Sequence, residues 1–145
     1  MPVQQTLDTA DAVVSLINAA GLTEGIIFAR VFVPEFEADE LTSPKGVVVA
    51  SSMEIENASR TTDHDDHSIE IGIGRRLSNE AADMATHLLT LEEVLGVIRD
   101  RDNAALTVSD GEIVRLKGAV QVRLYDPAHV VKRVALSVLR VIYRG

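Results

Sequence analysis

The pattern of apolar and polar positions is clearest between Ser68 and Arg101, where a strand runs directly into a helix. In Ser68–Gly74 three isoleucines alternate with Glu70 and two glycines, which is the period of two typical of a half-buried strand. From Leu77 onward the period changes to three and four, which indicates one face of a helix. That face consists of Met84, Leu88, Leu91, Leu95 and Ile98. Both elements need cover for an apolar side, so this unit is expected to form the core.

The same reading predicts elements on both sides of this unit. A first helix is expected over Leu7–Ala20, with Thr6 as its N-cap and Gly21 as its left-handed stop. Further strands are predicted at Ile26–Val33, Gly46–Ala50 with a continuation through Glu56, Ala105–Val108, Glu112–Leu116 and Ala119–Tyr125, with a short helical turn at Asp126-Pro127. Val130–Tyr143 fits both periods, and its valine content favours a strand.

Two of these strands are expected to pair as an antiparallel hairpin. Gly46–Glu56 precedes the Ser68–Gly74 strand, and the polar stretch Asn57–His67 separates them as a wide tip. The loop between the earlier strand and this hairpin contains Glu35, Phe36, Glu37, Asp39 and Glu40. It is interpreted as an exposed loop, with a docking segment as the alternative, because Phe36 is apolar among four acids.

Composition narrows the classes of protein. A chain of 145 residues with 46% hydrophobic residues is the size of one domain able to bury a core. Without Cys, disulfides, thiolate zinc sites and Cys nucleophiles are excluded. Aromatic residues are 3%, which argues against stacking platforms for single-stranded nucleic acid. The N-terminal residues lack the pattern of a signal peptide, so a cytoplasmic product is expected.

Charge is unevenly distributed along the chain. Net charge is −8, but thirteen acidic and three basic residues through Glu70 give −10, whereas the nine acidic and eleven basic residues after it give +2. An acidic surface opposes non-specific binding to duplex DNA. Either it only keeps the protein soluble, or it lines a passage to which DNA must not adhere.

Candidate chemistry is sparse. His64, Asp66 and His67 are the weak candidates for a metal site, because imidazole and carboxylate ligands suit zinc. In an extended tip, however, His64 and His67 point to opposite sides, so a solvated tip is preferred, with pH-sensitive contact to a neighbour as another alternative. Gly72 and Gly74 match only part of a dinucleotide fingerprint and are interpreted as allowing close approach of another element. With no catalytic motif, neither an enzyme nor a cofactor is predicted.

The order of elements resembles the tail completion or tail terminator proteins of long-tailed bacteriophages. The resemblance covers nearly the full chain and rests on patterns of small and apolar residues. They are Asp11–Ala20, Val33-Pro34, Gly46–Val49, Ala58-Ser59-Arg60, His67–Ile73, the long helix and Arg140–Arg144. The family is a group of minor tail proteins that join the tail to the head.

The resemblance implies a single α+β domain over residues 1–145, with a mixed, mostly antiparallel sheet and two helices packed on one face. It also implies a structural virion protein at the head-tail junction, assembled in the host cytoplasm as a ring, commonly of six subunits. Its partners would be the tail tube protein and the head-tail connector or neck proteins, and DNA would pass through without specific binding.

Other functions remain open from the sequence. They are a soluble non-viral binding module for a small ligand or protein partner, a connector (neck) adaptor protein, and an enzyme that uses the His/Asp tip. For partner contact or the lining of a lumen, the predicted residues are Glu35, Phe36, Glu37, Asp39, Glu40, Arg60, Asp63 and Asp65.

Overall fold

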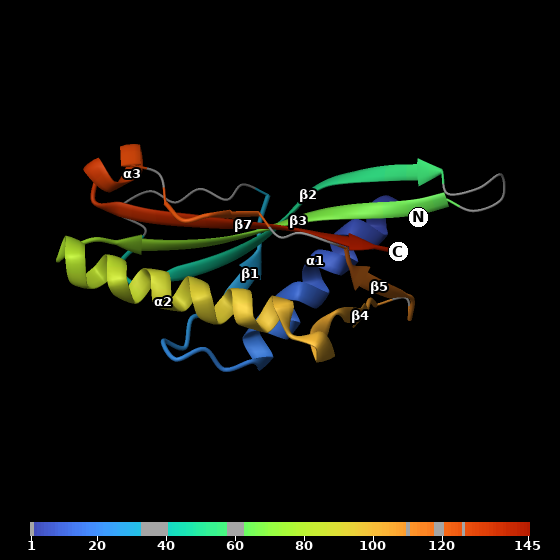
Figure 1. Cartoon of the computed structure of the whole chain (residues 1–145), viewed down its shortest axis with the longest axis horizontal. Helices are drawn as coiled ribbons and strands as arrows, with labels where there is room; N and C mark the ends of the chain where they lie inside the picture. Colours follow the sequence, from blue (N-terminus) through green and yellow to red (C-terminus); the bar gives the residue numbers. More distant parts are fainter. Residues whose placement is uncertain (1, 33–40, 58–62, 110, 118–120, 126) are drawn as a thin grey trace.

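A curled, mixed sheet with helices on both sides forms the protein (Figure 1). The computed structural model describes residues 2–32, 41–57, 63–109, 111–117, 121–125 and 127–145, with side chains except at 2, 55–57, 63–64 and 131. The helices are α1 (Pro2–Ala19), α2 (Glu80–Arg99) and α3 (Pro127–Val131), with a 3₁₀ turn at Arg101–Asn103. The strands are β1 (Phe28–Arg30), β2 (Lys45–Asn57), β3 (Asp63–Arg76), β4 (Ala105–Thr107), β5 (Ile113–Leu116), β6 (Gln121–Arg123) and β7 (Val134–Arg144).

Three long strands, β2, β3 and β7, form the centre of the sheet. The order is β1-β2-β3-β7-β5-β4, and β6 pairs with β7 beside β5. Only the β1–β2 pair is parallel among the pairings of the described strands. The expected fold class, a mixed and mostly antiparallel α+β sheet, is therefore confirmed. The ambiguous C-terminal segment is a strand, as its valine content predicted.

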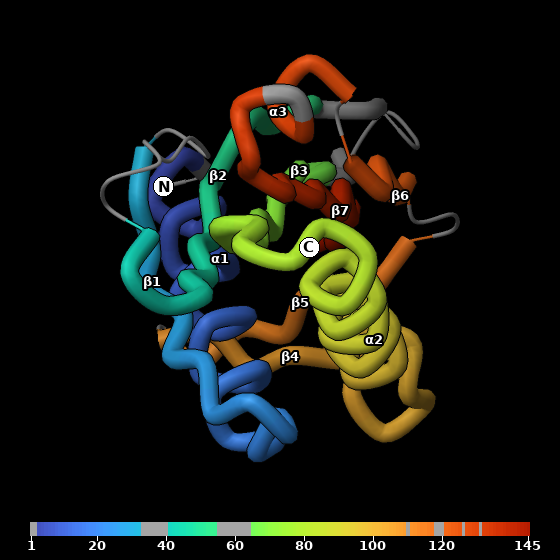
Figure 2. The backbone as a smooth tube through the Cα atoms, turned by 90° about the vertical axis from the view of Figure 1, so that its left-hand side faces the viewer, coloured from blue at the N-terminus to red at the C-terminus, as the bar shows by residue number. Residues whose placement is uncertain are grey.

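The core lies between the sheet and the two long helices. In Figure 2, α2 lies below β3 and β7, α1 lies to the left of α2, and α3 lies above these strands. Ile69, Ile71 and Ile73 of β3 are fully buried and pack in one cluster with residues of both helices. The helix contributions are Ala10, Val13, Ile17, Leu91, Val94 and Ile98. The alternation in β3 and the two helices on one face are confirmed.

The structure corrects the first helix. It begins at Pro2 instead of Leu7, so Thr6 is a buried helical residue and not an N-cap. Gly21 does have the left-handed conformation, with φ 67°, expected of a helix stop. In the second long helix, Asn79 is the N-cap and accepts a hydrogen bond from the Ala82 amide at 3.4 Å.

Among the described residues, the predicted strand Ile26–Val33 is limited to Phe28–Arg30. The Asn18 side chain of α1 accepts from the Phe28 amide at 2.8 Å and donates to the Phe28 carbonyl at 3.0 Å, which ties the start of β1 to the helix. The Phe28 ring lies over Gly46, where a Cβ would come within 2.4 Å of it. This close approach therefore requires glycine.

The hairpin tip is also shorter than predicted. Asp63–His67 continues β3 instead of forming a loop, and pairing extends to Asn57 opposite Asp63. The predicted strand Ala119–Tyr125 is reduced to Gln121–Arg123 among the described residues. No helix in the described ranges combines the length and apolar character needed to cross a membrane.

Candidate interaction surfaces

The β2–β3 hairpin extends beyond the rest of the sheet and forms an arm (Figure 1). Strand β1 covers β2 only at Gly46–Val48, and the pairing of β7 with β3 ends at Asp66 opposite Arg144. We define the arm as Glu54–Asn57 together with Asp63–Asp65. In this two-stranded ribbon the outer backbone groups have no third strand among the described residues. Such edges are templates for contact with another chain.

On one face, the base of the arm is held by a buried carboxylate. Asp66 is 5% exposed, and its Oδ1 accepts from Arg144 Nε at 2.8 Å, while its Oδ2 accepts from Lys117 Nζ at 2.6 Å. These hydrogen bonds, that of Arg144 foremost, lower the pKa of Asp66 to about 2 despite its burial. The Gly145 amide adds a bond to the Asp65 carbonyl at 2.9 Å. The C-terminal end of β7 thus fixes the start of the arm.

On the other face, the same base is held by His67. This side chain is fully buried, with Nδ1 2.7 Å from Thr6 Oγ1 and Nε2 3.2 Å from Gln5 Oε1. The Gln5 amide nitrogen donates to Glu112 Oε2 at 2.7 Å, so Oε1 of Gln5 must accept and Nε2 of His67 must donate. Burial lowers the pKa of His67 and so favours the neutral imidazole, whose tautomer these hydrogen bonds fix. Helix α1 and the arm are thereby joined.

These contacts change the interpretation of the polar Asp63–His67 stretch. Asp66 and His67 are not solvated tip residues but buried anchors, so His67 cannot act as an exposed pH-sensitive contact. Being adjacent in a strand, they face opposite sides and do not converge on one ion. Within the described part of the chain, no group of three or more His, Asp or Glu residues is placed to hold a metal.

The other predicted contact residues lie mostly outside the described residues. This applies to Glu35, Phe36, Glu37, Asp39, Glu40 and Arg60. Asp63 and His64 belong to the arm by their backbone, and Asp65 is a partly buried arm residue. The structure therefore places part of the predicted set on the arm.

A buried polar cluster under α2 was missed by sequence reasoning. Arg75 forms an ion pair with Glu24, which also accepts from the Thr90 hydroxyl. Burial raises the pKa of Glu24, but the bonds from Arg75 and Thr90 outweigh it and lower the pKa. His87, fully buried, lies with Nε2 2.8 Å from Ser137 Oγ, and burial lowers its pKa to about 4. These groups join α2 to the central strands.

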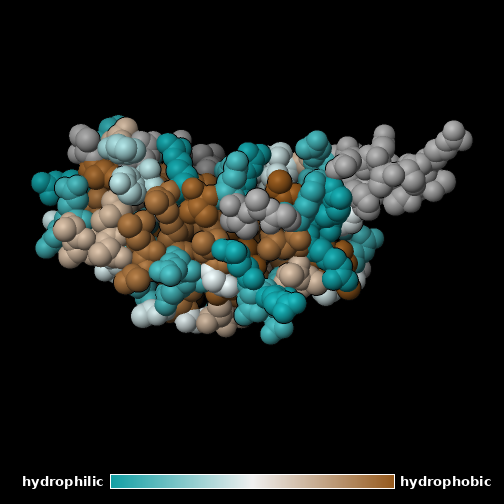
Figure 3. All heavy atoms as spheres, in the orientation of Figure 1, coloured by the Kyte–Doolittle hydropathy of each residue, from teal (hydrophilic) through white to brown (hydrophobic). Residues whose placement is uncertain are grey.

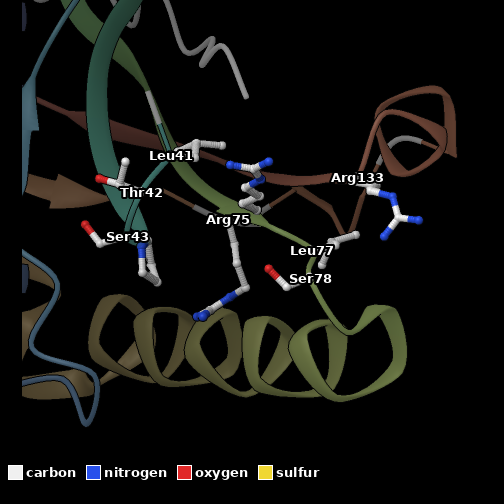
Figure 4. A pocket seen from close by; sticks show the side chains of 9 residues that line it. Leu41, Thr42, Ser43, Arg75, Leu77, Ser78 and Arg133 are labelled. Carbon is white, nitrogen blue, oxygen red and sulfur yellow. The ribbon is translucent and has the colours of Figure 1, made fainter. Parts of the chain in front are cut away.

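Next to this cluster lies a pocket of about 470 Å³ at the corner between β3 and α2 (Figure 4). It is lined by Leu41, Thr42, Ser43, Pro44, Arg75, Arg76, Leu77, Ser78 and Arg133. In Figure 4, Arg75 is directed toward α2, whereas Arg133 projects on the side of the pocket away from Leu41. We call Arg75, Arg76 and Arg133 the arginine corner. Three cations and three hydroxyls suit an anionic group.

Exposed apolar side chains occur at both edges of the sheet. Beside β1, Ile27 and Phe32 are 74% and 83% exposed. Near β6, Val122, Leu124 and Tyr125 are also exposed, next to a second pocket of about 550 Å³. Figure 3 shows hydrophobic side chains gathered in the middle of one face, with polar side chains around them. Contiguous exposed apolar patches are typical of contact surfaces.

Comparison with known proteins yields little. No protein-family profile matches the chain, and no curated protein matches its sequence. Among solved structures, the chain is similar to a component described as "Virion of native gene transfer agent (GTA) particle". The identity is 17%, the TM-score is 0.42, and the match covers 98% of this chain and 88% of the other. A TM-score this low assigns no role to the protein.

Proposed function

We propose that this protein is a non-catalytic structural component of a phage-like virion. In this proposal, six copies form a ring at the head-proximal end of a tail, where the ring terminates the tail tube and joins it to the connector. The single observation that carries the proposal is the β2–β3 arm. A two-stranded ribbon whose edges pair with no third strand among the described residues is suited to reach a neighbouring subunit.

The surfaces of the subunit are consistent with a ring. A ring requires heterologous contacts, in which two different surfaces of the same chain meet. The apolar residues beside β1 and those near β6 lie at different edges of the sheet. The anchors Asp66 and His67 hold the arm against the body, which reduces the conformational entropy lost when it binds a neighbour.

The charge distribution supports a passage for DNA. Through Glu70 the chain has a net charge of −10, and a lumen lined by this half would repel the phosphate backbone. DNA would then pass without specific binding. The tail tube protein and the connector or neck proteins would be the partners on the two sides of the ring.

The test is removal of the arm with preservation of its anchors. Replacing residues 55–65 with Asn-Gly joins Glu54 to Asp66, which are already paired, through a two-residue hairpin turn. We expect the full chain to form closed rings by light scattering and electron microscopy, and to bind the ends of purified tail tubes. The shortened variant should remain a folded monomer that unfolds cooperatively on heating, with a far-UV circular dichroism spectrum that still shows helix and strand.

Two results would contradict the proposal. A full chain that stays monomeric up to high concentration, both alone and with tail tubes, is incompatible with a ring protein. Rings of the shortened variant that are as stable as those of the full chain would mean that the arm does not hold the ring together.

A further inference from the structure

The arm and the arginine corner lie at opposite ends of one strand. Strand β3 is fourteen residues long and runs from Asp63 in the arm to Arg76 in the corner. At about 3.3 Å per residue, the two ends are about 45 Å apart. The arm therefore cannot reach the corner of its own chain, but it can reach that of a second copy.

The corner carries positive charge that this chain leaves largely uncompensated. Arg76 and Arg133 are exposed, and neither forms an ion pair with any described residue. Arg75 is 8% exposed, and its Nε has no hydrogen-bond partner among the described residues although Nη2 pairs with Glu24. None of the described residues that line the pocket is acidic. The exposed charges of Arg76 and Arg133 therefore suit a carboxylate supplied by another chain.

The backbone at Arg133 is a second unusual feature of the corner. Its φ of 60° lies in the left-handed region, which glycine or asparagine usually occupies after a helix. The turn is fixed by bonds from the Arg133 amide to the Val130 carbonyl (2.9 Å) and from the Leu77 amide to the Arg133 carbonyl (2.8 Å). An arginine at such a position has a backbone cost, and residues of this kind gather at functional sites.

The arm carries the complementary charge. Its two strands include Glu54, Glu56, Asp63 and Asp65, and the stretch Glu54–His67 as a whole has five acidic residues against Arg60. Glu54 is exposed and has no ion pair within the described ranges. Asp66, the fifth acid, is already paired with Arg144 and Lys117 at the base. Among the acids whose side chains the structure describes, Glu54 and Asp65 therefore remain available for contact with another chain.

We infer that the arginine corner of one copy binds the carboxylates of the arm of the next copy. This inference rests on the proposed ring and specifies one of its interfaces, a head-to-tail contact between opposite ends of the subunit. Arg76 and Arg133, the two exposed arginines of the corner, would pair with arm carboxylates at the rim of the pocket. Nucleic acid is the less suitable occupant, since the net charge of −8 opposes its approach.

A charge-swap experiment tests this contact. Arg76→Glu together with Arg133→Glu reverses the charge of the corner. Glu54→Lys together with Asp65→Lys reverses the charge of the arm. Each pair alone should weaken self-association at low salt about tenfold or more, because like charges then face each other across the interface. The protein with all four substitutions should recover most of that loss. A control with Arg99→Glu and Arg101→Glu, both exposed and outside the corner, should associate like the unmodified protein.

The outcomes separate this interface from the ring itself. If the unmodified protein never self-associates, both the ring and this contact are overturned. If it forms rings that neither charge pair weakens, the contact is wrong and the ring stands. If both pairs weaken the rings but their combination does not recover association, the two sets do not face each other, and the contact is again wrong. Retention of a duplex DNA probe that is lost with the corner substitutions would overturn the assignment to arm carboxylates.

Discussion

His87 illustrates at the scale of one residue how this core combines apolar packing with polar groups. It is fully buried on α2, and its Nε2 lies 2.8 Å from Ser137 Oγ on β7. Burial, together with the nearby Arg75 charge, lowers its pKa from 6.5 to about 4. The folded state therefore prefers the neutral imidazole, whereas the unfolded chain takes up a proton near pH 6.5.

The sign of the resulting pH dependence is fixed by this difference. The stability from the lowered pKa is fully present above pH 6.5 and is lost as the pH falls toward 4. Between pH 7 and pH 5 the free energy of unfolding should fall by about 2 kcal/mol from His87 alone. Urea unfolding of the monomer at several pH values measures this loss. His87→Gln should flatten the dependence, and an equal fall in the variant and the unmodified protein would contradict the prediction.

At the scale of elements, the arm depends on a carboxylate that β7 and the segment after β5 bind together. Asp66 is held by Arg144 and Lys117, and its pKa of about 2 keeps it charged at neutral pH. Asp66→Asn keeps the shape but removes the charge from both pairs. Because it leaves two cations beside a buried neutral amide, we expect a loss of about 1–3 kcal/mol in the free energy of unfolding.

Hydrogen exchange locates that loss. Amides of β2 and β3 at the base of the arm, around Met53 and His67, should exchange faster in Asp66→Asn, while those around Ile71 should keep their protection. Glu54→Gln is the matched control, because Glu54 pairs with Asp66 across the hairpin but makes none of its ion pairs. This variant should change neither the stability nor the exchange of these amides. Uniform acceleration across β3 in Asp66→Asn would show that the carboxylate supports the whole sheet and not the arm.

The elements differ in how far the sequence determined them. The β3–α2 unit was predictable because its periods depend only on which side faces the core, as the buried Ile69, Ile71 and Ile73 confirm. The starts of α1 and β3 were not, since they depend on contacts between residues far apart in sequence. Thr6 looks like a cap until its hydroxyl is seen against His67, and Asp66 looks solvated until Arg144 is placed beside it.

The same limit applies to the candidate surfaces of the whole molecule. The acidic half was visible in the charge count, but the corner was not, because Arg75 and Arg76 meet Arg133 only through the β3–β7 pairing. The sequence thus predicts an uneven charge, and the fold places part of it at two ends of one strand. Two variants with the same net charge but substitutions at different positions can show whether the location of the charge matters for assembly and DNA binding.

The acidic segment at Glu35, Glu37, Asp39 and Glu40 permits that test for the proposed lumen. Changing all four to Lys raises the formal net charge by eight, from −8 to 0. We expect this variant to stay folded as a monomer but to assemble poorly, or to form rings that retain duplex DNA at low salt, because phosphates are then attracted to lysines in the passage. Fluorescence anisotropy with a short duplex should show binding that decreases as salt is raised.

Changing Glu80, Glu92, Asp100 and Asp102 to Lys reaches the same net charge from exposed positions on and after α2. If that control binds DNA equally well, total charge is responsible and the acidic segment does not line the passage; if the first variant assembles normally without retaining DNA, the segment is not part of the passage at all.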